Sequence, residues 1–239
     1  MRFGKIEYLN LLVFDVFIKH YKMSSNLKSM FFLKKSYPSK LNKDFLFRRI
    51  DAGFISSIAG IHSHRISKAY NVGIIANKEV WSVLVLPLEL GDDYQSATSN
   101  ALSKLLDLEG RVLIGNRALQ YYHANRHKKC FIDMANVWHN KTGLPFIFGR
   151  VCVNGYTNFY GRLMLDFANR LGRGKACFKG IKIPHYIIMN SIRDIGISKG
   201  FALSYLKHIY YKIGYKERHS LDRFYRGLRL IGIKPPKRF

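Results

Sequence analysis

Hydroxyl side chains stand at two turns of the sequence where they could bind an anion. Ser56 and Ser57 follow an apolar run, and Thr98 and Ser99 precede the apolar-periodic stretch 101–106. Such turns offer hydroxyl groups and unpaired backbone N–H groups, and a helix start adds about half a unit of positive charge. These groups suit a carboxylate, but plain helix capping explains Thr98 and Ser99 equally well. The residues alone leave both interpretations open.

No side chain in these segments is placed to act as a base or an activated nucleophile. Asn10, which ends the first apolar run, cannot ionise, and Ser82, Thr98 and Ser99 have no recognisable His or Lys partner. Nothing in the sequence fixes the geometry of the remaining candidates for a base, which are His123, His127 and His139. The chemistry predicted from these residues is therefore orientation and hydrogen bonding.

Short β-rich runs alternate with helical patterns over the first 150 residues, which favours an α/β fold with parallel βαβ units. After residue 155 the pattern is helical, with Ser198 as a helix N-cap. The predicted strands are 5–10, 51–56, 72–76, 82–86, 111–115 and 144–151, and the predicted helices are 39–50, 98–107, 131–139, 159–171, 184–195, 201–213 and 216–230.

The chain of 239 residues is strongly basic, with a net charge of +25 and 48% hydrophobic residues. The excess is greatest in residues 151–239, which hold 18 Lys and Arg against 4 Asp and Glu. A field of this sign attracts nucleic acid, an acidic membrane surface or small anions, and it does not choose among them. In 216–230, arginines share an amphipathic pattern with apolar residues at helical spacing, which is typical of a solvated face on a packed helix.

Membrane, export and metal-binding classes have little support in the sequence. No apolar run approaches the roughly 18 residues of a membrane span, and Glu7 and Asp15 interrupt the apolar start. We therefore predict a cytoplasmic protein. Cys130, Cys152 and Cys177 are too scattered for a disulfide framework or a zinc site, so we expect no metal.

Six segments, in chain order, resemble the chorismate dehydratases of the futalosine route to menaquinone. They are spread along residues 2–150, and their specificity lies in the collinear set. They are Lys5–Leu12 with its Tyr-Leu-Asn, Ile50–Ile58, Val80–Val85, Ser96–Leu102, Ile114–Leu119, and Trp138 to Phe148 with its Thr-Gly-Leu-Pro-Phe.

The resemblance implies a two-lobed type II periplasmic-binding-protein-like fold, with mixed, mostly parallel sheets and flanking helices. It places residues 1–90 and 151–239 in one discontinuous lobe, residues 91–150 in the other, and the substrate cleft between them. It implies a hydro-lyase that converts chorismate to 3-enolpyruvylbenzoate without a cofactor. Because no side chain of the motifs stands out as a base, we hypothesise that the substrate's own enolpyruvyl carboxylate removes the ring proton. Asn10 and Ser82 would then be catalytic, and the substrate-binding residues would be Ser56, Ser57, Thr98, Ser99, Asn100 and Asn116.

Two positions depart from the family pattern. Val13 stands where the family has Pro, which would fix the turn that presents Asn10, and Asn116 stands where it has Asp. A looser turn or a lost charge would lower activity.

Three alternatives stay open at this point. The first is the related 1,4-dihydroxy-6-naphthoate synthase, which shares the fold. The second is a non-catalytic protein of the same fold that binds a small anion. The third is nucleic-acid binding driven by charge, for which no recognition motif is present, so no specific nucleic acid is expected. A homodimer is possible.

Overall fold

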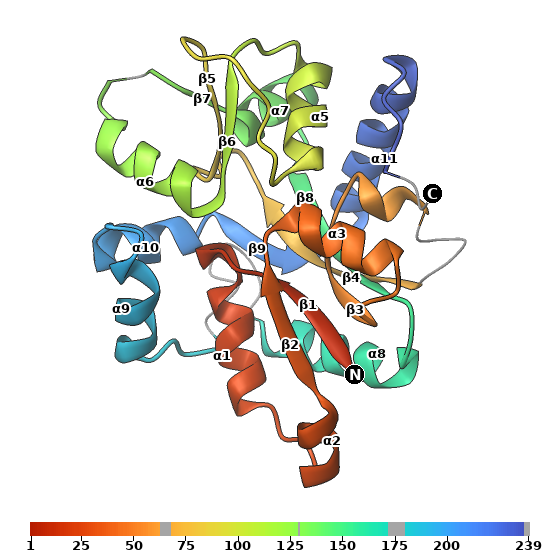
Figure 1. Cartoon of the computed structure of the whole chain (residues 1–239). Coiled ribbons are helices and arrows are strands. Elements are labelled where there is room, and N and C mark those ends of the chain that lie inside the picture. Colours follow the sequence, from red (N-terminus) through yellow and green to blue (C-terminus); the bar gives the residue numbers. More distant parts are fainter. Residues whose placement is uncertain (63–67, 129, 172–179, 237–239) are drawn as a thin grey trace.

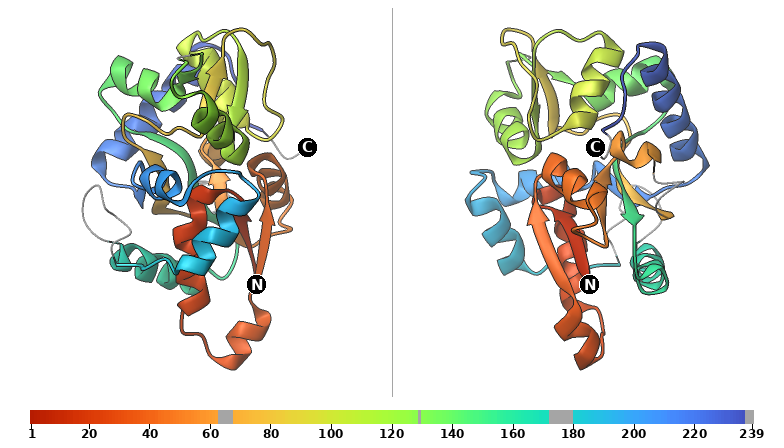
Figure 2. Two further views of the ribbon diagram at one scale, coloured as in Figure 1. Left: turned by 90° about the vertical axis from the view of Figure 1, so that its left-hand side faces the viewer. Right: turned by 45° about the vertical axis from the view of Figure 1, so that its right-hand side comes forward.

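The computed structural model describes residues 1–62, 68–128, 130–171 and 180–236 and contains two β-sheets flanked by helices (Figure 1). The large sheet has the strand order β2-β1-β3-β8-β4-β9, and the small sheet has the order β6-β5-β7. Two further views (Figure 2) show the small sheet with its helices beside one end of the large sheet. We call the two parts the large lobe and the small lobe.

The large sheet is mixed, as predicted, but it is not mostly parallel. Strand β1 (Arg2–Ile6) pairs in parallel with β2 (Phe32–Ser36) and with β3 (Ala52–Ser56). Strand β8 (Phe146–Val153) returns from the small lobe and runs antiparallel between β3 and β4 (Lys68–Ala76). Because β8 runs antiparallel to both of its neighbours, β3 and β4, the strand direction reverses at the centre of the sheet. The small sheet is wholly antiparallel among the described residues.

The small lobe contains the three strands β5 (Val83–Leu86), β6 (Arg111–Ile114) and β7 (Ile132–Asp133). Its helices are α5 (Ala97–Leu106), α6 (Gly115–Asn125) and α7 (Met134–Thr142). Since β5 lies in the small sheet and β8 in the large one, the chain changes sheet before residue 83 and again before residue 146. The lobe boundaries at residues 90 and 150 stay a prediction.

The N-terminal elements differ from the predicted pattern around Asn10. The predicted strand 5–10 is wrong beyond Ile6, because the chain turns into the 3-10 helix Leu9–Leu11 and then into α1 (Leu12–His20). Helix α1 packs its buried apolar face into the core, a period-3.6 pattern that the strand interpretation overlooked. Strand β2 and helix α6 were also not predicted. Helix α2 (Ser25–Met30) and helix α3 (Pro38–Leu46) complete this region.

The C-terminal third is mainly helical, as predicted, with one strand. Its helices are α8 (Thr157–Arg170), α9 (His185–Arg193), α10 (Lys199–Leu206) and α11 (Tyr215–Leu230). The Ser198 hydroxyl caps α10 by accepting from the Phe201 N–H, which confirms the predicted N-cap. The predicted helix 201–213 is wrong in its second half, because Ile209–Lys212 forms β9 on the edge of the large sheet beside β4. Apolar and aromatic residues of this kind fit a pleated surface.

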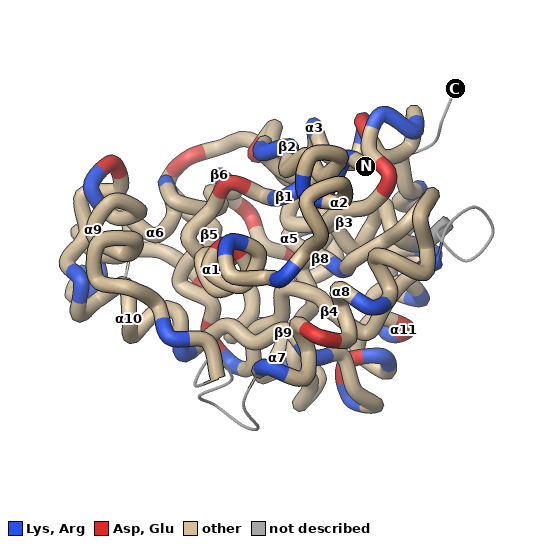
Figure 3. The backbone as a smooth tube through the Cα atoms, turned by 90° about the horizontal axis from the view of Figure 1, so that it is seen from below, with Lys and Arg blue, Asp and Glu red and all other residues tan. Residues whose placement is uncertain are grey.

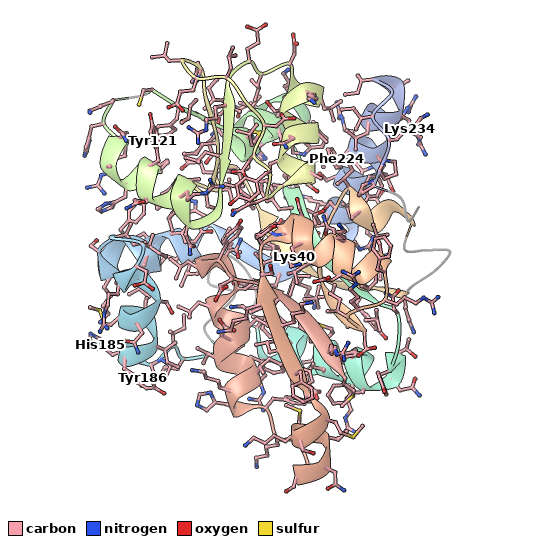
Figure 4. All side chains as sticks on the ribbon, viewed as in Figure 1. Lys40, Tyr121, His185, Tyr186, Phe224 and Lys234 are labelled. Carbon is pink, nitrogen blue, oxygen red and sulfur yellow. The ribbon has the colours of Figure 1, made fainter. Side chains whose placement is uncertain are left out.

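Helix α11 confirms the predicted amphipathic pattern. Leu221, Phe224 and Leu228 are buried, while the arginines of the helix are exposed. Phe224, labelled in Figure 4, packs edge-on against Phe146 of β8 and Trp138 of α7. The helix therefore joins both lobes through apolar contacts.

Lys and Arg are distributed widely over the chain trace, with fewer Asp and Glu (Figure 3). Among the described residues, no helix combines the length and the apolar character needed to cross a bilayer. Cys177 lies outside the described residues.

Candidate functional site

A cavity of about 40 Å³ lies between the lobes. Four of the eight predicted site residues, Asn10, Ser56, Ser82 and Ser99, line it together although they are widely separated in the sequence. The full lining is Ile6, Tyr8, Asn10, Pro38, Ser56, Ile74, Val80, Ser82, Val83, Ser96, Ser99, Ile114, Gly115 and Phe148. It contains apolar side chains and neutral hydrogen-bonding groups, and none of its members is Asp, Glu, His, Lys or Arg.

Asn10 is presented by the 3-10 helix that follows β1. Its backbone carbonyl accepts a hydrogen bond of 2.6 Å from the Tyr211 hydroxyl, which fixes the backbone. Its side-chain oxygen Oδ1 is buried and accepts no hydrogen bond within the described part of the chain. An unsatisfied buried polar atom costs about 1–3 kcal/mol. A ligand that donates to this oxygen would remove that cost.

Ser82 is almost fully buried at the start of β5. Its hydroxyl oxygen lies 2.9 Å from the Tyr205 hydroxyl, and its carbonyl accepts a hydrogen bond of 2.8 Å from the Gly115 N–H. The two bonds tie the residue to α10 on one side and to the start of α6 on the other. The Ser82 hydroxyl is therefore held at the wall of the cavity.

The turn before Ser82 is strained and is held by a buried carboxylate. Trp81 has a φ of 57°, in the left-handed region that L-residues avoid. Asp133 Oδ2 accepts from the Val80 and Trp81 N–H groups, at 2.9 and 2.7 Å, while Oδ1 caps α7. Burial raises the pKa of Asp133 to about 6, and its backbone hydrogen bonds oppose that rise.

The Trp81 ring lies between aromatic side chains of both lobes. It stacks on Tyr122 of α6 and Phe201 of α10, with centroids 5.0 and 5.3 Å apart, and it also contacts His208. Burial lowers the pKa of His208. This aromatic contact and the Asp133 carboxylate together hold the backbone that leads into Ser82.

We expect the Asp133→Ala substitution to lower the free energy of unfolding by about 3 kcal/mol, since buried backbone donors and a helix cap lose their acceptor. We also expect kcat to fall, because the turn before Ser82 is released. Urea unfolding measures the first effect, and steady-state turnover, with chorismate as the substrate that the sequence resemblance implies, measures the second.

Asp133→Asn separates the two parts of this prediction. The amide keeps one oxygen for the cap of α7 but presents an NH₂ group to the Val80 and Trp81 donors. It should lose less stability than Asp133→Ala and still lose turnover. Wild-type kcat in both variants would contradict the role assigned to the turn.

The other two predicted residues that line the cavity, Ser56 and Ser99, are held by neighbours. The Ser56 N–H donates to Asn42 Oδ1 at 3.0 Å, and the Asn42 amide donates to the Ser56 hydroxyl. Ser99 is bonded to Ser96, which caps α5 through the Ser99 N–H at 3.1 Å. Capping by Thr98 or Ser99 is therefore wrong, because the cap is Ser96 and the two residues lie in the first turn of α5. The capping Ser96 also lines the cavity.

The remaining four predicted residues do not line the cavity and bond to the protein instead. The Ser57 hydroxyl donates to the Ile147 carbonyl, and Asn100 bonds twice to the backbone of Asp93. Thr98 accepts from the Ile58 N–H at 3.1 Å, and Asn116 accepts from the Leu9 N–H at 3.0 Å. Their contact with substrate stays a prediction.

Sequence reasoning missed the other ten lining residues, and three of them matter most for the argument: Tyr8, Ser96 and Gly115. Tyr8 donates from its hydroxyl to Gln95 Oε1 at 2.6 Å, and burial raises the pKa of its phenol well above the usual range. Each of the three lies inside a segment that carries the family resemblance, and Tyr8 stands two residues before Asn10. Their place in these segments was the signal in the sequence that could have identified them as site residues.

Several hydrogen bonds join the lobes across this region. Tyr8 bonds to Gln95, Leu9 bonds to Asn116, and the Ile58 N–H bonds to Thr98. Ligand cavities usually measure about 300–1,000 Å³, whereas this one measures about 40 Å³. The cavity is therefore smaller than a typical ligand cavity, and these hydrogen bonds hold the two lobes together beside it.

The two departures from the family pattern have a structural explanation. Val13 is helical and fully buried in the first turn of α1, so packing holds the backbone near Asn10 where Pro would have done so. Asn116 uses only an acceptor oxygen toward Leu9, which an Asp would also supply. Arg117, its neighbour, is paired with Asp93 at 2.9 Å.

The three histidines considered as bases do not line the cavity. His123 packs on Phe201, and His139 lies 3.4 Å from the Leu144 carbonyl oxygen. Within the part of the chain that the structure describes, no three His, Cys, Asp or Glu side chains are grouped for a metal ion.

Comparisons with known proteins show the family and the fold. The model of a family described as menaquinone biosynthesis matches residues 107–229. A chorismate dehydratase of Campylobacter jejuni subsp. jejuni is 40% identical over 237 residues, which is 98% of this chain and 100% of that protein.

Solved structures of low sequence identity share the fold. A protein from Archaeoglobus fulgidus aligns with a TM-score of 0.74 at 14% identity, over 97% of each chain. The alkanesulfonate-binding protein SsuA from Xanthomonas axonopodis pv. citri, bound to MOPS, aligns with a TM-score of 0.61 at 12% identity, over 99% of this chain and 94% of that one. The architecture is thus that of periplasmic binding proteins. The chain belongs to the menaquinone-biosynthesis family that includes the chorismate dehydratases.

Proposed function

We propose that this protein is a chorismate dehydratase, a lyase that removes water from chorismate to form 3-enolpyruvylbenzoate during menaquinone biosynthesis. The named relative and the family match support the reaction. The single structural observation that carries the site is the buried Asn10 oxygen, which has no donor within the described ranges of the chain and lies in the cavity that Ser82 also lines.

The reaction breaks a C–H bond on the ether-bearing ring carbon and the C–O bond of the neighbouring hydroxyl. The electron pair of the C–H bond forms the new ring double bond, and the hydroxyl and the proton leave as water. Because the ring becomes aromatic, the elimination is strongly favoured. The protein needs to supply orientation and a path for one proton.

The substrate's own enolpyruvyl carboxylate is the proposed base. The cavity lining contains no carboxylate and no imidazole, and its one phenol, on Tyr8, has a raised pKa and is protonated at neutral pH. The Ser82 hydroxyl would donate to the carboxylate and hold it over the ring proton. The Asn10 amide would donate through nitrogen and accept, through Oδ1, from a substrate hydroxyl or the newly protonated acid.

The hydroxyls of Ser56 and Ser99 are proposed to orient the ring carboxylate and the departing water, because they lie in the same cavity. Ser57, Thr98, Asn100 and Asn116 are proposed as further substrate-binding residues, and two of them, Thr98 and Asn116, bond to backbone N–H groups of the other lobe. A cytoplasmic location and a homodimer stay predictions from the sequence.

The test is incubation of the purified chain with chorismate alone. Loss of the diene absorbance, with 3-enolpyruvylbenzoate appearing by chromatography above the rate without protein, is the expected result. Intact chorismate that protects the protein against thermal unfolding would point to binding without catalysis. If chorismate is not converted and also does not protect the protein against thermal unfolding, the proposed function is refuted.

A further inference from the structure

Two tyrosines of the C-terminal third reach the residues at the centre of the site. The hydroxyl of Tyr205, on α10, lies 2.9 Å from Ser82 Oγ, and the hydroxyl of Tyr211, on β9, lies 2.6 Å from the Asn10 carbonyl oxygen. The proposed catalytic pair is therefore held by two tyrosines that are distant in sequence. Tyr205 is 123 positions from Ser82, and Tyr211 is 201 positions from Asn10. No motif of the first 150 residues contains them.

Tyr205 lies where its hydroxyl can orient the O–H bond of Ser82. Its side chain is 1% exposed, and burial raises the pKa of its phenol far above neutral pH, so the hydroxyl keeps its proton. A protonated phenol that donates to Ser82 Oγ occupies one lone pair of that oxygen. The Ser82 proton has no acceptor among the described residues, and the residue lines the cavity.

We propose that Tyr205 is a positioning residue, whose hydroxyl donates to Ser82 Oγ and turns the Ser82 proton toward the substrate carboxylate. The inference rests on the proposed function. A serine without this partner rotates among staggered positions and acts as donor or acceptor in turn. With Tyr205 donating, Ser82 is left with donation into the cavity, which is the role that an anionic substrate requires.

The backbone around the pair supports this assignment. Ser82 is fixed by the Gly115 N–H and by the turn that Asp133 holds, so its Cβ direction is set before substrate binds. The neighbouring Phe201 of α10 stacks on Trp81 and seats the helix that carries Tyr205. With the backbone held, the Ser82 side chain can still rotate about its own bonds, and the hydrogen bond from Tyr205 restricts that rotation.

The experiment compares Tyr205→Phe with Tyr160→Phe in the full chain, using chorismate as substrate. Tyr160 is fully buried on α8, and its hydroxyl has no partner in the described structure. Removing that hydroxyl therefore controls for the loss of a buried tyrosine hydroxyl that orients no other residue. We expect kcat of Tyr205→Phe to fall about 5- to 10-fold, which is the loss of one hydrogen bond near 1 kcal/mol. KM should change less than kcat, and Tyr160→Phe should keep both constants.

The Ser82→Ala background tests whether Tyr205 acts through Ser82. The double variant Ser82→Ala/Tyr205→Phe should turn over no more slowly than Ser82→Ala alone, because nothing remains to be oriented. Multiplicative losses, or an unchanged kcat in Tyr205→Phe, overturn the proposal. So does a Ser82→Ala variant with the wild-type rate.

Failure of the proposed function gives a different result. Suppose that the wild-type protein does not convert chorismate. Urea unfolding of the wild type, Tyr205→Phe, Ser82→Ala and the double variant still measures the Tyr205–Ser82 hydrogen bond, as a coupling between the two substitutions. Coupling without turnover refutes the lyase alone. Absence of coupling refutes the Tyr205 role, whatever the reaction is.

Discussion

Replacing Asn10 by Ala lowers kcat/KM for chorismate by roughly 100-fold, the usual cost of removing one preorganised hydrogen-bonding group from a reaction centre. We expect the thermal unfolding temperature of the Asn10→Ala variant to stay near that of the wild type. The reason is that the Asn10 oxygen accepts no hydrogen bond in the described structure, while the fold depends on its backbone carbonyl. Steady-state kinetics and a thermal melt measure the two quantities.

Asn42 is the matched control for this prediction. Its carboxamide is buried and bonded in both directions to Ser56. Asn42→Ala leaves the Ser56 N–H without its acceptor and should lower the free energy of unfolding by about 2 kcal/mol. Because Ser56 is proposed only to orient the substrate, the loss of activity should be smaller than in Asn10→Ala. If Asn10→Ala keeps full turnover, its assignment as a catalytic residue is wrong.

Replacing Gly115 by Ala should lower kcat/KM by about 100-fold, because misplacement of a reacting group by about 1 Å has that effect. Gly115 has a φ of +65°, and an added Cβ would lie 2.5–2.7 Å from ring atoms of Tyr8. The ring would have to move, and with it the chain two residues before Asn10. Turnover of chorismate and the free energy of unfolding are the measurements.

Gly143 provides the comparison that isolates the steric effect. It has a φ of +70°, close to that of Gly115, but an added Cβ meets nothing within 4 Å. Both Ala variants should lose about 1 kcal/mol of stability from the left-handed backbone. Only Gly115→Ala should lose activity. Equal activities of the two variants would show that the contact with Tyr8 has no part in the site.

Sequence patterns located the regular elements where a single period dominates. Helix α11 was predicted correctly because its apolar residues repeat every three or four positions, and they are buried in the structure. The C-terminal half of 201–213 was predicted wrongly, because Ile209–Lys212 is too short to show a period and becomes a strand only through pairing with β4. The strand directions of the large sheet also depend on long-range pairing, which local pattern does not contain.

The candidate site divides in the same way. The turn hydroxyls and Asn10 were found from residue type and from the order of the resembling segments, and four of the eight meet in one cavity. The partners that orient them were not found. Tyr205 and Tyr211 lie in a stretch that reads locally as a packed helix, and only the fold brings their hydroxyls to Ser82 and Asn10.

By itself, the sequence determined the α/β class, the family and the chemical types available to the site, because each is carried by residues near one another in the chain. Tertiary structure alone decided which polar atoms lack a partner. It left the Asn10 oxygen without a donor among the residues that the structure describes, while Thr98 and Asn116 are bound to backbone N–H groups of the other lobe. The physical reason is that hydrogen-bond satisfaction is a property of buried neighbours, and those neighbours come from segments up to 201 residues apart.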